Sequence, residues 1–256
     1  ADFNQPLLQK MMLDAPGKVR QLTSDAARGE TAPAYSPDGS QIAYFSYRKG
    51  AENESIWVMR ADGSNPLQLA FDEFINVYPH WTTGGQAVIY AARQRGQTRR
   101  FEFRRALVSG GRPETLGQYE YTALARSGGP RIDIGPDGRI VLLDGNVRIW
   151  DPKTKQAQPV ADVKGLDPQW SHSGRSIAYR VDPREAGDAR AGLWTYNFKD
   201  PPRQLFRGWV VRAAWASEDE LIVVEGKANL KAPVWRVYAD GRAPVRTPIT
   251  LQLVHS

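Results

Sequence analysis

The sequence contains no cysteine and only three histidines. Without cysteine the chain forms no disulfide, has no thiolate nucleophile and binds neither cysteine-ligated zinc nor an iron–sulfur cluster. A histidine-based metal centre needs several convergent ligands, and His80, His172 and His255 fall in different sequence contexts. No apolar run approaches the length of about 18 residues that a membrane-spanning helix requires. The sequence therefore predicts no metal site and no membrane span.

Motifs for nucleophilic catalysis and phosphate binding are also missing. A serine hydrolase usually carries its nucleophile in Gly-x-Ser-x-Gly, and a phosphate-binding loop reads Gly-x4-Gly-Lys-Ser/Thr. Neither pattern occurs in this chain. The segment Ser171-His172-Ser173-Gly174 is of the small polar type that favours turns, so we interpret it as a turn. We accordingly predict no catalytic residue and no cofactor.

The composition instead indicates many short strands and turns. The chain has 8 Trp, 10 Tyr and 8 Phe together with 23 Gly and 18 Pro, and aromatic residues favour strands while Gly and Pro favour turns. The net charge of +6 raises nucleic acid as a partner. However, the local basic cluster alternates with Phe101 and Phe103, which is typical of a half-buried strand with a solvated face. Nucleic acid is therefore not favoured. The cluster consists of Arg99, Arg100, Arg104 and Arg105.

Internal repetition is the dominant signal. In its clearest copy, the turn sequence Ser36-Pro37-Asp38-Gly39 precedes the apolar run Ile42–Phe45, and a further strand and the turn Ala61-Asp62-Gly63 follow. Proline presets φ, aspartate caps its own backbone and glycine accepts a positive φ, so these segments suit tight turns. The same order returns along the chain, and its equivalent aromatic or apolar positions are Tyr35, Trp81, Ile134, Trp170 and Trp215.

Four short strands in a unit of roughly 40–45 residues are typical of a β-propeller blade. We predict one all-β domain over residues 1–256 with repeats at about 32–70, 77–117, 121–162, 165–207 and 209–249. A closing blade is expected from residues 7–23 together with 250–256, since strands from both termini would hold the end blades together. Six blades are thus favoured. Five blades are the alternative, because the composite blade lacks a second strand.

The repeat resembles the WD40-like (PD40) repeat of the TolB-like β-propeller family. The resemblance covers nearly the whole chain and implies a bacterial propeller that is exported to the periplasm or outside the cell. A cytoplasmic domain of a larger protein is the alternative location. The matching segments are Arg20-Gln21-Leu22-Thr23, Ser36-Pro37-Asp38-Gly39, Ile42-Ala43-Tyr44, Ile56-Trp57-Val58-Met59 and Ala61-Asp62-Gly63.

Candidate binding residues follow from their place in the repeat. Propellers bind ligands at the mouth of the central channel, where the inner strands converge, and on the loops of either face. We expect the polar residues of the predicted inner strands to face that channel. They are His80, Arg131, Asp133, Asp167, Gln169 and Arg212.

The leading hypothesis is a non-catalytic scaffold that binds a protein or peptide, as a sensor or interaction module of a larger bacterial protein. Propellers similar to this one are also appended to enzymes. The alternative is therefore a glycosidase or lyase acting in the channel, or the substrate-gating propeller of a hydrolase. The repeat itself specifies a fold and carries no chemistry, and the sequence does not indicate an oligomeric state.

Overall fold

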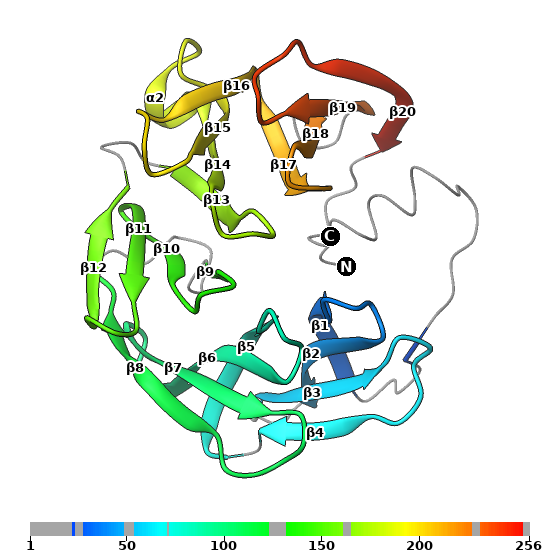
Figure 1. Cartoon of the computed structure of the whole chain (residues 1–256), viewed down its shortest axis with the longest axis vertical. Coiled ribbons are helices and arrows are strands. Elements are labelled where there is room, and N and C mark those ends of the chain that lie inside the picture. Colours follow the sequence, from blue (N-terminus) through cyan, green and yellow to red (C-terminus); the bar gives the residue numbers. More distant parts are fainter. Residues whose placement is uncertain are drawn as a thin grey trace. The chain divides into compact units, whose positions relative to one another are not determined.

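The computed structural model describes residues 22–23, 28–48, 54–70, 72–122, 132–160, 165–226 and 231–252. In these ranges the chain forms five four-stranded antiparallel sheets, and each sheet is a run of four consecutive strands (Figure 1). The sheets belong to two compact units, two sheets to the first unit and three to the second. Each sheet is one propeller blade.

The first unit contains the first and second sheets. The first sheet consists of β1 (Arg28–Tyr35), β2 (Gln41–Arg48), β3 (Glu54–Arg60) and β4 (Leu67–Ala70). The second sheet consists of β5 (Phe74–Trp81), β6 (Ala87–Gln94), β7 (Arg100–Leu107) and β8 (Glu114–Glu120). Ile56 of the first sheet and Tyr90 of the second belong to one buried apolar cluster, so the core of this unit lies between the two sheets.

The second unit contains the other three sheets. The third sheet consists of β9 (Ile132–Ile134), β10 (Ile140–Asp144), β11 (Asn146–Asp151) and β12 (Gln156–Pro159). The fourth consists of β13 (Gly165–Trp170), β14 (Ile177–Val181), β15 (Gly192–Tyr196) and β16 (Arg203–Arg207). The fifth consists of β17 (Val210–Trp215), β18 (Glu220–Glu225), β19 (Lys231–Tyr238) and β20 (Val245–Gln252). Apolar clusters join the third sheet to the fourth and the fourth to the fifth.

A short helix, α2 (Pro183–Ala186), follows β14. Its N-cap is Asp182, whose side chain accepts a hydrogen bond from the backbone N–H of Arg184, as polar N-cap residues commonly do. No helix in the described ranges is long and apolar enough to cross a membrane.

The favoured number of six blades is wrong, since the described residues form five, the number kept as the alternative. Residues 250–252, expected in a closing blade, instead end β20, where Leu251 pairs with Ala232 of β19. The two strands are paired on both sides of a register shift between Pro233 and Trp235. The turn after β19 therefore leads into a long fourth strand and leaves no separate strand at 250–252. The other parts of the expected blade, residues 7–21 and 253–256, lie outside the described residues.

The first strands of the sheets carry the feature that shapes the candidate site. In β1, β5, β13 and β17 the register with the second strand shifts, which marks a β-bulge or a comparable irregularity. Three of these strands hold a non-glycine residue at positive φ directly before a proline, and bulges often re-aim a side chain next to a functional site. These residues are Ala32 (φ 47°), Tyr78 (φ 56°) and Asp167 (φ 47°).

Candidate functional site

Three of the six predicted binding residues meet in the second unit. Asp167 and Gln169 lie on β13, Arg212 lies on β17, and Arg180 of β14 joins them. We call these four residues the Asp167 cluster. A small pocket opens beside it, and its lining residues are Asp167, Gln169, Ala178, Arg180, Leu193 and Ala213.

The backbone of β13 positions the carboxylate at the centre of this cluster. Asp167 lies at φ 47° within the register shift between Leu166 and Gln169. Aspartate is one of the few non-glycine residues that adopt this region with some frequency, at a cost of about 1–3 kcal/mol. The residue that follows is Pro168, so the conformation interrupts the ladder and directs the Asp167 side chain toward Arg180.

Asp167 forms a hydrogen bond with one arginine and a longer ion pair with another. Arg180 Nε donates to Asp167 Oδ2 at 2.5 Å, and Arg180 Nη1 also donates to the carbonyl oxygen of Val210 at 3.4 Å. Arg212 Nη1 lies 3.9 Å from the same Asp167 Oδ2, which is an ion pair without a hydrogen bond. The Arg212 side chain is 40% exposed, against 12% for Asp167. Two guanidiniums and one carboxylate give these three residues a net charge of +1.

Gln169 joins the fourth sheet to the fifth. Its Nε2 donates a 2.7 Å hydrogen bond to the carbonyl oxygen of Ala213. In return, the indole Nε1 of Trp215 donates to the carbonyl oxygen of Gln169 at 3.5 Å. These two contacts hold the first strands of adjacent sheets together beside the pocket, and they fix the Gln169 amide with its Oε1 available as an acceptor.

Asp133 has a different environment. Its Oδ1 accepts a 2.9 Å hydrogen bond from the backbone N–H of Ile134, and its Oδ2 accepts one of 2.6 Å from the backbone N–H of Trp170. Asp133 therefore links β9 to β13, and this position favours a structural role. Its ligand-binding role stays a prediction.

Of the other two predicted residues, the structure describes only His80, which does not join the cluster. His80 lies on β5 in the first unit, where it pairs with Ile89 and is half-buried. Arg131 lies outside the described residues. The prediction from the repeat thus identified Asp167, Gln169 and Arg212 as neighbours, while ligand binding by any of the six remains a prediction.

Arg180 was missed because only first strands were considered. It lies on the second strand of its sheet, within the run Ile177–Val181. The sequence did carry a signal, since Arg180 is the one charged residue in this apolar strand. In the structure the other four residues of the strand are buried and Arg180 is half-buried. A charge in such a strand needs a partner, and the nearest carboxylate on the neighbouring strand is Asp167.

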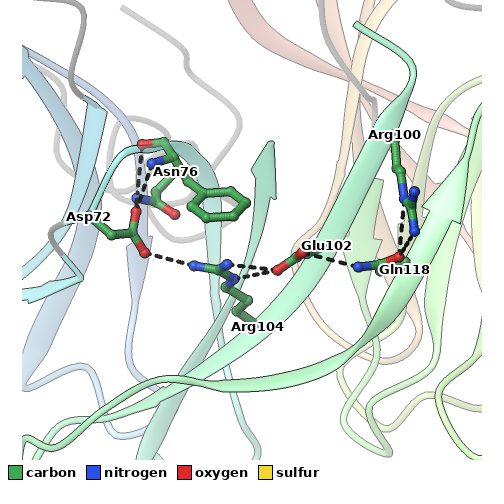
Figure 2. A network of polar contacts seen from close by, with 7 residues as sticks. Asp72, Asn76, Arg100, Glu102, Arg104 and Gln118 are labelled. Atoms are coloured by element: carbon green, nitrogen blue, oxygen red, sulfur yellow. Dashed lines mark hydrogen bonds and ion pairs between the residues drawn. The ribbon is translucent and has the colours of Figure 1, made fainter. Parts of the chain in front are cut away.

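A second polar network lies in the first unit and involves the basic cluster noted in the sequence (Figure 2). Arg104 Nη1 donates to Asp72 Oδ2 at 2.7 Å, and Arg104 Nη2 donates to Glu102 Oε2 at 2.7 Å. The Arg104 guanidinium also lies 3.8 Å from the centre of the Phe74 ring, and its side chain is only 13% exposed. Asn76 Nδ2 donates to Asp72 Oδ1 at 2.9 Å.

This network changes the interpretation of the basic cluster. Arg104 does not lie on a solvated face as expected, because acidic partners and an aromatic ring enclose it. Arg105 pairs with Glu114 at 2.5 Å on the surface, and Arg100 donates to Gln118. Much of the positive charge is therefore compensated within the sheet, which favours a structural role for these arginines over phosphate binding.

The described residues offer no obvious metal site. In the ranges that the structure covers, no group of three or more His, Asp or Glu side chains is arranged to hold a metal ion. The Asp167 cluster contains one carboxylate, which two arginines already contact. Its chemistry suits the recognition of an anionic or hydrogen-bonding partner.

No protein-family model matches the sequence, and no curated protein sequence matches it significantly. Solved structures do match. TolB from Acinetobacter baumannii aligns with a TM-score of 0.58 at 16% identity, over 89% of this chain and 54% of that chain. An oligogalacturonate lyase from Vibrio parahaemolyticus gives a TM-score of 0.63 at 11% identity, over 93% and 71%. A puromycin hydrolase gives 0.64 at 15% identity, over 95% and 42%.

These likenesses concern the fold. The matched proteins include a TolB, a lyase and a hydrolase, and one fold commonly hosts unrelated functions. Together with the five four-stranded sheets of the described residues, they confirm the all-β propeller expected from the repeat, though not the favoured count of six blades. The chain has the fold of a TolB-like β-propeller.

Proposed function

We propose that this chain is a non-catalytic binding module for a protein or peptide, and that the partner docks at the Asp167 cluster. The proposal rests on the exposure and weak pairing of the Arg212 side chain. Its side chain is 40% exposed, and within the described structure its one polar contact is the 3.9 Å ion pair with Asp167. Exposed arginines held beside a pocket are frequent anchors of protein interfaces.

The chemistry of the cluster supports binding over catalysis. General acid–base catalysis needs a group that gains and loses a proton near the working pH, and arginine stays protonated throughout that range. Asp167, the one carboxylate of the cluster, is 12% exposed and engaged by Arg180. Gln169 does not titrate. None of these four side chains is therefore a good nucleophile or general base.

The cluster also presents polar groups with which a polypeptide can form hydrogen bonds. Arg212 presents N–H donors at the surface, and the Nε2 of Gln169 donates to Ala213, which leaves the Gln169 Oε1 as an acceptor. A peptide carries carbonyl acceptors and N–H donors that can pair with these two groups.

Selection of peptides on the full chain tests this proposal. A phage library of random dodecapeptides is selected on the immobilised protein, and the enriched peptides are then measured against two variants. Arg212→Gln should weaken them at least tenfold, which corresponds to a charged hydrogen bond. The matched control is Arg236→Gln in the same sheet, whose side chain is 45% exposed and pairs with Glu220 at 3.4 Å. This control should change affinity less than twofold.

Two results would contradict the proposal. One is the absence of any enriched peptide, and the other is a set of peptides that bind Arg212→Gln as tightly as the unmodified chain. Turnover of oligogalacturonate by the full chain with Mn²⁺ would contradict the non-catalytic part, because a structural match of the fold is an oligogalacturonate lyase in complex with manganese.

The TolB-like fold further supports a bacterial protein of the periplasm or the cell exterior as the setting of this binding module. Fractionation of cells that express the complete gene, with the protein detected by antibody, tests the location. Recovery in the cytoplasmic fraction would contradict it.

A further inference from the structure

We propose that the Asp167 cluster recognises acidic residues, with the guanidinium of Arg212 binding the side-chain carboxylate of an Asp or Glu in the partner. This inference rests on the proposed function, since it names the chemistry of the peptide that the same site takes. It depends on three properties of the cluster: the free donors of Arg212, the way its neighbours hold it, and the local balance of charge.

Arg212 keeps its donors because Arg180 satisfies Asp167. Arg180 Nε donates to Asp167 Oδ2 at 2.5 Å, whereas Arg212 Nη1 stays 3.9 Å from that oxygen. This distance is too long for a hydrogen bond. A guanidinium has five N–H donors in a planar fork that matches a carboxylate with two parallel hydrogen bonds. In the described structure none of the five donates to the protein, so the whole fork is available to a ligand.

Neighbouring contacts fix the backbone at Arg212. It lies on β17, pairs with Val224 and follows the register shift at Val210. The same strand is tied to β13 at the next residue, because Gln169 Nε2 donates to the carbonyl oxygen of Ala213 at 2.7 Å. The ion pair keeps the guanidinium near Asp167, which lines the pocket. Holding a donor near its binding geometry lowers the entropy cost of association.

The charge balance selects a carboxylate over a phosphate. Arg180 and Arg212 together with Asp167 carry a net charge of +1, which complements one carboxylate. A phosphate group carries a charge of about −1.5 to −2 and would lie close to the Asp167 carboxylate, whose repulsion would offset part of its attraction to Arg212. Phosphate sites usually gather arginines without such a carboxylate.

A peptide fits the remaining acceptor better than an isolated anion does. The Gln169 side chain uses its N–H on Ala213, and its Oε1 is left to accept a hydrogen bond from an N–H donor. A backbone amide of the peptide supplies that donor beside the carboxylate. The site thus recognises one carboxylate and one backbone amide. A free carboxylate ion would bind Arg212 but would supply no N–H donor to Gln169.

Nuclear magnetic resonance provides a local reporter for the test. The indole N–H of Trp215 donates to the carbonyl oxygen of Gln169, so its signal in the ¹⁵N-labelled full chain reports on the cluster. The probe is the blocked peptide acetyl-Gly-Gly-Glu-Gly-Gly-amide, which carries one carboxylate, and its control is the same peptide with Gln in place of Glu. Affinities are measured by titration of both peptides against the unmodified chain and against the variants.

The expected result is that the Glu peptide shifts the Trp215 signal and binds at least tenfold more tightly than the Gln peptide, as for the loss of a charged hydrogen bond. Arg212→Gln should remove this difference. Arg212→Lys, which keeps the charge but loses the fork, should retain an intermediate preference, and Arg236→Gln should behave like the unmodified chain. Circular dichroism confirms that each variant is folded, and the Lys variant provides an independent check if the Gln variant does not fold.

The other outcomes separate the two proposals. If the Glu and Gln peptides shift Trp215 and bind equally, the acidic preference is overturned while peptide binding stands. If inorganic phosphate binds more tightly than the Glu peptide, the carboxylate preference is overturned. If an oligogalacturonide shifts Trp215 and the Glu peptide does not, the site reads carboxylates of sugars, and both the inference and the proposed peptide function are wrong.

Discussion

The indole Nε1 of Trp81 in β5 donates a 2.8 Å hydrogen bond to the carbonyl oxygen of Ala34 in β1. Trp215 in β17 makes the equivalent contact to Gln169 in β13, at 3.5 Å. In both pairs a large residue of one first strand reaches the first strand of the preceding sheet. The repeat therefore encodes a contact between sheets as well as the strands within each sheet.

The Trp81 contact predicts a measurable loss of stability in Trp81→Phe. The substitution removes the N–H donor from the carbonyl oxygen of Ala34, which should cost about 1 kcal/mol beyond the loss of ring volume. Trp170→Phe is the matched control, because the Nε1 of Trp170 is buried and has no hydrogen-bond partner among the described residues. Urea unfolding of both variants measures the difference. Equal losses in the two variants would show that the Trp81 hydrogen bond does not contribute.

Adjacent arginines on β7 should differ strongly in their contribution to stability. Arg104→Met should lower the free energy of unfolding by about 3 kcal/mol, because the side chain is 13% exposed and its removal leaves Asp72 and Glu102 without their cation. Arg105→Met should cost less than about 1 kcal/mol, since Arg105 and Glu114 are 45% and 57% exposed. Chemical denaturation of the two variants tests this, and a similar cost for both would refute the role assigned to the network in Figure 2.

The sequence predicted much of the fold because turns and alternation are local properties. In the turn after β1, for example, Ser36 Oγ donates to Asp38 Oδ1 at 2.6 Å and the N–H of Ser40 donates to the same oxygen. Such contacts depend on residues a few positions apart, which the repeat displays directly. The division of the chain into blades followed from these turns, whereas the assignment of one domain over the whole chain stays a prediction.

Nonlocal features were harder to predict. The count of blades failed at residues 250–252 because β20 is paired with β19 on both sides of the register shift between Pro233 and Trp235, and no local signal reveals that pairing. Part of the Asp167 cluster was found because Asp167, Gln169 and Arg212 occupy first strands. Arg180 comes from the second strand, and its ion pair with Asp167 became evident only from the three-dimensional arrangement.

Gly192 should tolerate no side chain. It lies at φ 144°, and a Cβ added to it would overlap the backbone carbonyl oxygen of Phe206 on the neighbouring strand. Gly192→Ala should therefore destabilise the chain by more than about 3 kcal/mol, through both the clash and the strained φ. Gly145→Ala is the control, since it lies at φ 74° with no atom within 4 Å of the added Cβ, and it should cost about 1–2 kcal/mol. Thermal unfolding compares the two, and equal costs would contradict the expected clash.

The N-cap of α2 should make part of the stability depend on pH. The hydrogen bond from the Arg184 side chain lowers the pKa of Asp182 below its ordinary value of 3.8, and the backbone N–H of Arg184 adds to the effect. A carboxylate whose pKa is lower in the folded state stabilises the fold above the ordinary pKa, and this contribution disappears as the pH falls through the folded value. Asp182→Asn keeps a capping oxygen but removes the charge.

The Asn variant should therefore be less stable than the unmodified chain by about 0.5–1 kcal/mol near pH 7, as for a partly exposed ion pair, and the difference should be smaller at a pH below the ordinary Asp pKa of 3.8. Urea midpoints at both pH values measure it. In the background of Arg184→Gln, which lacks the guanidinium that contacts Asp182 at 2.6 Å, Asp182→Asn should show a smaller pH-dependent difference. A difference of the same size at both pH values would exclude the Asp182 carboxylate as its source.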